Sequence, residues 1–274
     1  MTTPTLELNN GTSIPQIGLG LWKVKSENEC VEAIKFALDA GYRHFDTAQT
    51  YLNEQFVGEA IAKSEYERSD LFITTKIQNE NQFWEDVIPS FDTSLEKLQT
   101  DYVDLLLIHF PVSQTRTMAW RRLEQLYTEG RAKAIGVSNY TIKHLEELMS
   151  KFNIVPAVNQ VELHVFLQQT ELVEFCKANK IVVEAYSPLA HGIRMDDPKI
   201  MEIAEKHHKS VSQIMLRWLV EQELVILPKS IHQNRIIENI EVFNFKLDSD
   251  DMMKISTCED DFRTCWDPSN IALC

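Results

Sequence analysis

Apolar residues recur along the chain in two alternating patterns, one typical of amphipathic helices and one typical of buried strands. From Ser26 to Ala40 they fall at helical spacing, and Ser26 is suited to cap the start of that helix. A short β-leaning segment, residues 41–46, follows it, and residues 102–109 form a nearly continuous apolar run of the kind found in strands covered on both faces. These patterns predict alternating helices and strands.

The alternation continues to the end of the sequence. Further strands are predicted over residues 71–76, 132–138, 157–162, 181–187 and 225–230, and a last apolar run over 242–245 brings the count to about eight. Helices are predicted over residues 53–63, 83–98 (with Pro89 near its start or at a kink), 117–129, 142–150, 168–179, 198–207 and 212–221, with one more from residue 234.

About eight βα units predict an α/β fold, and a closed (β/α)8 TIM barrel fits them better than an open sheet. No Pro/Gly/Ser-rich linker or low-complexity segment divides the series, so we expect a single domain over residues 1–274. The segment 6–14 contains Asn10-Gly11, a strong hairpin signal. We therefore expect an N-terminal β-hairpin that closes the bottom of the barrel.

Charge and composition limit the kinds of partner that the protein is expected to bind. The chain of 274 residues carries 27 Lys and Arg against 41 Asp and Glu, a formal net charge of -14, which disfavours nucleic acid. No apolar run reaches the roughly 18 residues of a membrane span, and the first residues do not form a signal peptide. The five cysteines lack C-x-x-C spacing, so reduced thiols are expected. We expect a cytoplasmic monomer without a membrane or nucleic-acid partner.

Polar residues follow the apolar stretch of seven predicted strands. In a barrel, the C-terminal strand ends carry the chemistry, so these residues are candidates for a common site. The alternative is that strands become polar where they leave the core, which explains Ser and Asn better than Lys and His. The residues concerned are Asp46, Lys76, His109, Ser138 with Asn139, Gln160 with Glu162, Ser187, and Lys229 with Ser230.

One group of four residues points to carbonyl chemistry. The phenol of Tyr51 has an ordinary pKa of about 10 and is a poor acid at neutral pH, but a nearby Lys76 ammonium would lower that pKa. Asp46 would offset the cost of burying Lys76. His109 could donate a hydrogen bond to a substrate carbonyl. Taken singly, each residue has an ordinary structural explanation, and only the four together favour carbonyl chemistry.

A second cluster predicts an anion site. Lys229 and Ser230 end a strand, Arg235 lies one to two helical turns further on, and a helix start between them offers free N–H groups. A guanidinium in this place suits a 2'-phosphate, although a solvated helix start explains the charges too. The pair Gly18 and Gly20 lacks the third glycine of a Rossmann fingerprint, so a dinucleotide would have to bind in another geometry.

Across almost its whole length the sequence resembles the aldo-keto reductases. Six motifs in the same order carry the resemblance: residues Gly41 to Tyr51, Leu107 to Pro111, Ile135 to Asn139, Val158 to Glu162, Ala185 to Leu189, and Leu227 to Ser230 with Arg235, Glu238 and Asn239. The resemblance implies NADPH as hydride donor, a broad range of small aldehydes or ketones as substrates, and no metal.

The resemblance also implies the roles of individual residues. Asp46, Tyr51, Lys76 and His109 would form a catalytic tetrad in which Tyr51 is the general acid. Ser138, Asn139 and Gln160 would hold the nicotinamide carboxamide, and Tyr186 would stack on its ring. The remaining residues implied to bind NADP are Gly20, Leu21, Trp22, Ser187, Leu189, Lys229, Ser230, Ile231, Arg235, Glu238 and Asn239.

Some positions depart from the family pattern. Phe110 stands where Trp is usual, Gln78 where a pocket Trp is common, and Val165 where Pro is usual after His164. The short stretch 111–114 implies an open site similar to that of microbial diketogluconate reductases. Trp22, Phe110 and Trp266, within the tail 263–268, are expected to line it, with packing as the alternative role for Trp22 and Trp266.

Two other functions remain as alternatives. A metal-dependent barrel hydrolase could use side chains of this kind around an activated water, although their spacing fits badly. A non-catalytic NADPH-binding protein could use the same fold, but the complete tetrad argues against it. The ligands of the hydrolase would be His44, Asp46, Lys76, His109 and His164.

Overall fold

The computed structural model describes residues 3–269, and its centre is one sheet of eight parallel strands. Backbone hydrogen bonds join the first strand to the last, from Gly18 N to Ile226 O (2.9 Å) and from Gly20 N to Pro228 O (3.1 Å), so the sheet closes into a barrel. The predicted TIM barrel is therefore confirmed. In sheet order the strands are β3 (Leu19–Gly20), β4 (His44–Asp46), β5 (Phe72–Ile77), β6 (Val103–Ile108), β7 (Ala132–Ser138), β8 (Val158–Glu162), β9 (Val182–Tyr186) and β10 (Val225–Leu227).

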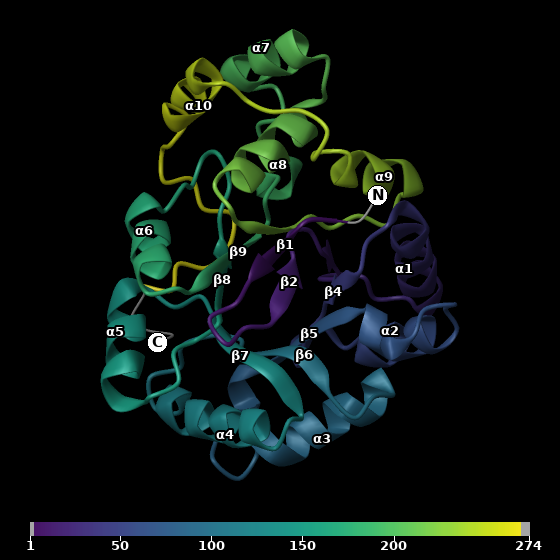
Figure 1. The fold of residues 1–274 in the computed structure, drawn as a ribbon, viewed down its shortest axis with the longest axis vertical. Helices are drawn as coiled ribbons and strands as arrows, with labels where there is room; N and C mark the ends of the chain where they lie inside the picture. Colours follow the sequence, from purple (N-terminus) through teal and green to yellow (C-terminus); the bar gives the residue numbers. More distant parts are fainter. Residues whose placement is uncertain (1–2, 270–274) are drawn as a thin grey trace.

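Helices surround the strands in a ring, with α7 and α10 on the far side of α8 (Figure 1). The predicted Ser26 cap is present, because its hydroxyl accepts from Glu29 N (3.2 Å), and Gly41 ends the same helix in the left-handed conformation. The helices are α1 (Glu27–Ala40), α2 (Glu54–Ala62), α3 (Val87–Leu98), α4 (Arg116–Thr128), α5 (Ile142–Lys151), α6 (Thr170–Ala178), α7 (Pro198–His207), α8 (Val211–Glu221), α9 (Gln233–Ile240) and α10 (Ser249–Ser256).

Two predicted elements differ from the structure, and one helix was missed. The eighth strand is Leu19–Gly20, and the apolar run 242–245 is not a strand, because it packs outside the barrel, where Val242 O accepts from Arg217 Nη1 (3.0 Å). Helix α3 begins at Val87, after a turn over 83–86, and Pro89 lies in its first turn, where a missing N–H costs nothing. Helix α10 was not predicted.

The N-terminal hairpin pairs β1 (Thr5–Glu7) with β2 (Ser13–Pro15), and Gly11 takes the left-handed conformation in its turn. Figure 1 shows it across the middle of the barrel. Leu8 and Ile14 are buried in one apolar cluster with barrel residues such as Phe72 and Leu105. The hairpin thus plugs the N-terminal end of the barrel, as predicted.

The other half of the barrel interior is polar. Buried side chains from β4, β5, β8 and β9 lie there, above the apolar layer. Buried polar groups need partners, so this half must contain a hydrogen-bonded network. The buried polar side chains of this half are His44, Asp46, Thr74, Lys76, Gln160 and Glu184.

The described residues include no helix long and apolar enough to cross a membrane.

Candidate active site

Lys76 is the centre of the polar network. It is fully buried near the C-terminal end of β5, and its Nζ donates to both carboxylate oxygens of Asp46 (2.6 and 2.7 Å) and to Thr47 O (3.0 Å). The same Nζ lies 3.3 Å from the hydroxyl of Tyr51. The structure therefore brings together the lysine, aspartate and tyrosine that the sequence singled out.

A short turn holds Tyr51 against the lysine. After β4 the chain makes a 3-10 turn over Gln49–Tyr51, which ends at Leu52 in the left-handed conformation. Asn53 fixes the turn, because its amide donates to Leu21 O (2.9 Å) and Val24 O (3.0 Å) and accepts from Thr47 Oγ1 (2.6 Å). Backbone and side-chain hydrogen bonds thus place the phenol at the rim of the barrel.

Burial and charge act in opposite directions on this group. Burial is the largest single effect and opposes a charged lysine, but the Asp46 charge and hydrogen bond, together with the smaller effects of Tyr51 and Glu184, raise the pKa of Lys76, so the ammonium persists. Burial raises the pKa of Tyr51 to about 12, against the lowering effect of the Lys76 charge. The predicted effect of the lysine is present, but the expectation of a net lowering is wrong. Tyr51 is a protonated phenol at neutral pH.

His109 follows β6 and faces the tyrosine. The two rings meet edge to face with centroids 5.6 Å apart, and His109 N donates to Ile77 O (3.1 Å). Burial, together with the charge of Lys76, lowers the pKa of His109 to about 3. The imidazole is therefore neutral at physiological pH and can donate one hydrogen bond without carrying a charge.

Four residues predicted for the nicotinamide end of the cofactor, three for its carboxamide and Tyr186 for its ring, lie beside this group. Asn139 is held in the left-handed conformation, and its amide donates to His109 O (3.0 Å) and accepts from the Tyr186 hydroxyl (2.8 Å). Ser138 Oγ donates to Gln160 O (2.9 Å). Gln160 is almost fully buried and donates through Nε2 to Asp46 Oδ2 (2.8 Å). The four side chains form a polar cradle next to Tyr51.

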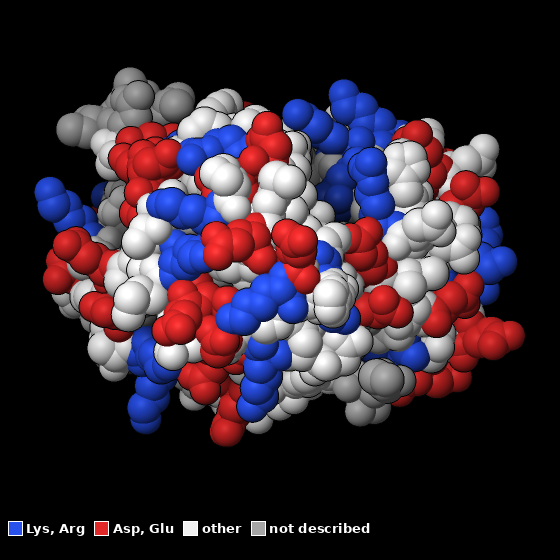
Figure 2. Space-filling model, turned by 90° about the horizontal axis from the view of Figure 1, so that it is seen from above, with Lys and Arg blue, Asp and Glu red and all other residues white. Residues whose placement is uncertain are grey.

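The predicted anion site lies around the start of α9. The side chains of Lys229 and Arg235 are exposed and form no hydrogen bond or ion pair with any part of the chain between residues 3 and 269, so both cations are available to a ligand. Ser230 is buried, and its hydroxyl accepts from His232 N (3.1 Å). On the face in Figure 2, lysine and arginine side chains gather at the upper right, on the side where α9 lies in Figure 1. Glu238 and the buried Asn239 lie on the same helix.

The other residues predicted to bind the cofactor vary in access. Leu21 is fully buried in the hydrophobic core. Both of its backbone polar groups have partners within the chain, because its N donates to Asp46 O (3.0 Å) and its O accepts from Asn53. Gly20 lies at the closure of the barrel, where an added Cβ would lie 3.2 Å from Leu227 O. Leu189 and Ile231 are partly buried against the core, and Ser187 lies just after β9.

The predicted substrate residues lie in two ring pairs. Phe110 is buried and contacts Trp266 edge to face at 6.3 Å, whereas Trp266 itself is largely exposed. Trp22 is partly exposed and packs on His191 at 5.5 Å, with Lys23 Nζ above its ring at 4.0 Å. All three predicted residues thus lie at the rim, and sequence reasoning missed the contribution of His191.

A buried carboxylate anchors the C-terminal tail over the rim. Glu162, at the end of β8, accepts from Thr264 N (2.7 Å) and Thr264 Oγ1, and from Cys265 N (3.1 Å). Cys265 in turn lies 3.8 Å from the Ser187 hydroxyl. The tail therefore bridges the loops after β8 and β9, and the position of Glu162 at a strand end was the sequence signal for an anchor of this kind.

Glu184 is a second residue that sequence reasoning missed. It is fully buried in the barrel interior and accepts from Gln160 Nε2 (2.6 Å). The signal was a carboxylate within the apolar strand β9, between Val183 and Ala185. A charged residue in such a run lies inside a barrel only where partners exist, which made it a candidate for the site.

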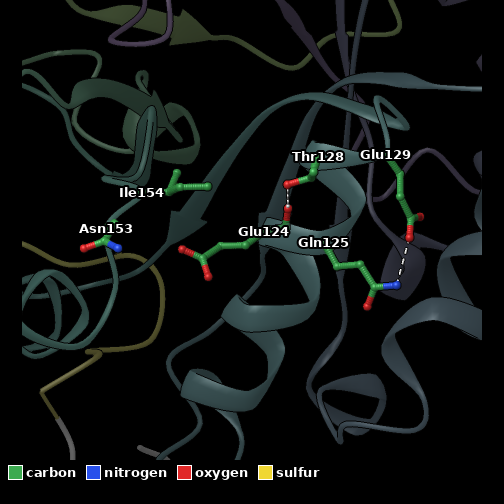
Figure 3. A pocket seen from close by; sticks show the side chains of 6 residues that line it. All are labelled: Glu124, Gln125, Thr128, Glu129, Asn153 and Ile154. Carbon is green, nitrogen blue, oxygen red and sulfur yellow. Dashed lines mark hydrogen bonds between the residues drawn. The ribbon is translucent and has the colours of Figure 1, made fainter.

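Of two surface hollows, one lies apart from this group and the other borders it. One of about 460 Å³ lies between the end of α4 and residues 153–154, where Figure 3 shows Gln125 and Glu129 hydrogen-bonded to each other (2.8 Å). It contains no basic or nucleophilic side chain and is lined by Glu124, Gln125, Thr128, Glu129, Asn153 and Ile154. Another of about 590 Å³ lies beneath the tail, beside Asn139 and Glu162. Among residues 3–269, no three His, Cys, Asp or Glu side chains are placed to hold a metal ion.

A protonated phenol beside a buried ammonium, a neutral imidazole and two free cations occur at one rim of a parallel barrel. This arrangement is typical of a barrel enzyme whose site lies at the C-terminal ends of the strands.

Comparisons with known proteins agree with this class and give the family. The model of the aldo/keto reductase family matches residues 16–260, and the chain belongs to this family. It is 46% identical to the glyoxal reductase of Bacillus subtilis (strain 168) over 267 residues, 97% of each chain. It is 40% identical to the methylglyoxal reductase DkgA of Escherichia coli O157:H7 over 275 residues, 98% of each chain.

A solved structure supports the same assignment. The aldo-keto reductase of Bombyx mori in complex with NADP superimposes with a TM-score of 0.90 at 35% identity, covering 96% of this chain and 95% of that one. The resemblance stated from the sequence motifs, and with it the enzyme class of an aldo-keto reductase, is confirmed.

Proposed function

We propose that this protein reduces small aldehydes and ketones, including 1,2-dicarbonyl compounds, to alcohols with NADPH, and that Tyr51 is the proton donor. The observation that carries the proposal is the Lys76 ammonium, which Asp46 holds 3.3 Å from the Tyr51 hydroxyl. The NADP complex of a relative supports the cofactor, and the names of the two reductases support the substrate class.

The protein's part in the reaction is to place the carbonyl and to move one proton. When bound, NADPH supplies the hydride. Tyr51 gives its proton to the carbonyl oxygen, and Lys76 stabilises the phenolate that remains. Since the His109 imidazole is neutral, it orients the carbonyl by a hydrogen bond and does not compete as a strong acid.

The residues present fit the cofactor at both of its ends. The polar cradle of Ser138, Asn139 and Gln160 suits a carboxamide, and Tyr186 is the flat side chain beside it. At the other end, Lys229, Ser230 and Arg235 would hold phosphate, with Glu238 and Asn239 on the adjoining helix face and Ser187 in between. Trp22, Phe110 and Trp266 would form the substrate wall.

Replacing Tyr51 with phenylalanine tests the proton donor. Tyr51→Phe removes one oxygen and keeps the ring, so we expect turnover with methylglyoxal and NADPH to fall by a factor of about 100 or more, the contribution of a positioned general acid. NADPH binding, followed by fluorescence titration, should change little. Unchanged turnover would remove Tyr51 from this role, and lost NADPH binding would point to a structural role.

Replacing Arg235 with alanine tests the phosphate assignment. A charge-assisted hydrogen bond contributes roughly 1.5–3 kcal/mol, so Arg235→Ala should weaken NADPH binding by a factor of about 10 to 100 and leave NADH binding nearly unchanged. The exposed Lys199, on α7, gives a matched control in Lys199→Ala. An equal loss for both cofactors would contradict the assignment.

We also propose that residues 1–274 act as one catalytic domain and as a monomer, because every group in the proposed mechanism comes from one chain. Light scattering at working concentration tests this, and a dimer mass would contradict it.

A further inference from the structure

Glu184 is a fully buried carboxyl of the barrel interior that the proposed mechanism does not use. It lies opposite Gln160 in the β8–β9 register, with its Oε2 2.6 Å from Gln160 Nε2. Its other oxygen, Oε1, is buried and accepts no hydrogen bond from the described residues, and the nearest basic nitrogen, His44 Nε2, lies 3.6 Å away. A buried carboxyl oxygen without a donor is costly if charged.

The amide nitrogen of Gln160 also contacts a second carboxyl group. Nε2 lies 2.6 Å from Glu184 Oε2 and 2.8 Å from Asp46 Oδ2, so both hydrogens of the NH2 group have acceptors. The reversed amide would place its oxygen against two carboxyl oxygens, which is repulsive. Two acceptors therefore fix the orientation of this amide, and the Gln160 carbonyl oxygen remains to accept a hydrogen bond.

The surroundings of Glu184 favour its neutral form. The titratable groups around it are His44 and Asp46 from β4 and Lys76 from β5, with Tyr51 beyond the lysine, whereas β10 contributes only apolar residues. Burial, and then the Asp46 charge, raises the pKa of Glu184 to about 8. A neutral acid still offers Oε2 as an acceptor, and a proton on Oε1 removes the negative charge from the oxygen that has no donor.

We propose that Glu184 is a positioning residue that, as an uncharged acid, holds the Gln160 amide with its carbonyl oxygen toward the cofactor site. This orientation selects a pyridine cofactor whose ring substituent can donate an N–H group. The inference rests on the proposed function, because it assumes that the nicotinamide end lies at Gln160. It concerns discrimination between cofactors, and the proton transfer from Tyr51 does not depend on it.

The test compares NADPH with its reduced 3-acetylpyridine analogue, in which an acetyl group replaces the carboxamide and no N–H is present. Dissociation constants come from fluorescence titration, so activity is not the readout. We expect wild type to prefer NADPH by about tenfold. Glu184→Gln keeps a carbonyl acceptor and should retain that preference, whereas Glu184→Met removes the acceptor and should reduce it to about twofold or less.

Binding of 2',5'-ADP is the internal control, since this fragment lacks the nicotinamide and should bind all three proteins equally. Equal preference in wild type and Glu184→Met, with 2',5'-ADP binding intact, would overturn the proposal. So would loss of the preference in Glu184→Gln. If wild type bound neither NADPH nor 2',5'-ADP, the proposed function would fail instead.

A second measurement applies if Glu184→Met does not fold. The infrared difference spectrum of wild type minus Glu184→Gln at neutral pH should contain the carbonyl band of a protonated carboxylic acid. A spectrum with carboxylate bands alone would overturn the neutral form and with it the proposal.

Discussion

Mild acid should destabilise the barrel through His44. This side chain is fully buried, and its Nε2 lies 3.0 Å from Thr74 Oγ1. Burial, reinforced by the charge of Lys76, lowers the pKa of His44 from 6.5 to about 3. Gly18 packs closely against the ring, because a Cβ added there would lie 2.7 Å from His44 Nδ1. The folded protein therefore holds this imidazole neutral.

The sign and size of the effect follow from proton linkage. Below a pH of 6.5 the unfolded chain binds a proton at His44, but the folded chain does not until the pH approaches 3, so the free energy of unfolding falls as the pH falls. The slope is about 1.4 kcal/mol per pH unit. At about pH 5 the loss from His44 alone is therefore roughly 2 kcal/mol.

Urea denaturation of wild type and His44→Gln at about pH 7.5 and pH 5 measures this loss. The quantity compared is the change in the free energy of unfolding between the two pH values, because this change does not depend on the variant's own stability at pH 7.5. It should be about 2 kcal/mol smaller in the variant. His232→Gln, at an exposed position, is the control and should behave as wild type. Equal pH dependence in His44→Gln and wild type would refute the reasoning.

Two further substitutions test the packing and the charge pair. Gly58→Ala places a Cβ 2.3 Å from the Lys97 carbonyl oxygen of α3, so thermal unfolding should show a loss of about 1–3 kcal/mol despite the better helix propensity of alanine, and equal or greater stability would contradict this. Lys76→Met leaves the buried Asp46 carboxylate unpaired, so the free energy of unfolding measured by urea denaturation should fall by roughly 3–5 kcal/mol. Turnover should be lost as well. The double variant Asp46→Asn, Lys76→Met should recover stability without activity, and recovered turnover would exclude the proposed role of the ammonium.

The strand ends explain why much of the site was predictable. Asp46, Lys76 and His109 each follow an apolar run, and parallel strands bring their C-terminal ends to one rim, so separation in sequence did not hide their proximity. The strand Leu19–Gly20 was missed because two residues show no periodicity, and barrel closure by pairing with residues near Ile226 makes it a strand.

Residues inside the barrel were harder to predict than those at its rim. The sequence shows that Glu184 interrupts an apolar strand, but its partner Gln160 and its protonation depend on packing. The same holds for Tyr51, where the sequence predicted the effect of a neighbouring ammonium but not the larger opposing effect of burial. Burial is a tertiary quantity, so local patterns predict which groups interact and not the balance of their energies.

The two halves of the barrel interior depend on each other. Leu8 and Ile14 of the hairpin region cover the apolar half, and the Asp46–Lys76 pair is almost fully buried in the other half. In this water-poor interior the lysine acts on Tyr51 across 3.3 Å with little screening, which is why its charge can partly offset the effect of burial on the phenol. In the proposed mechanism, the hairpin plug therefore supports the chemistry at the opposite end of the barrel from outside the site.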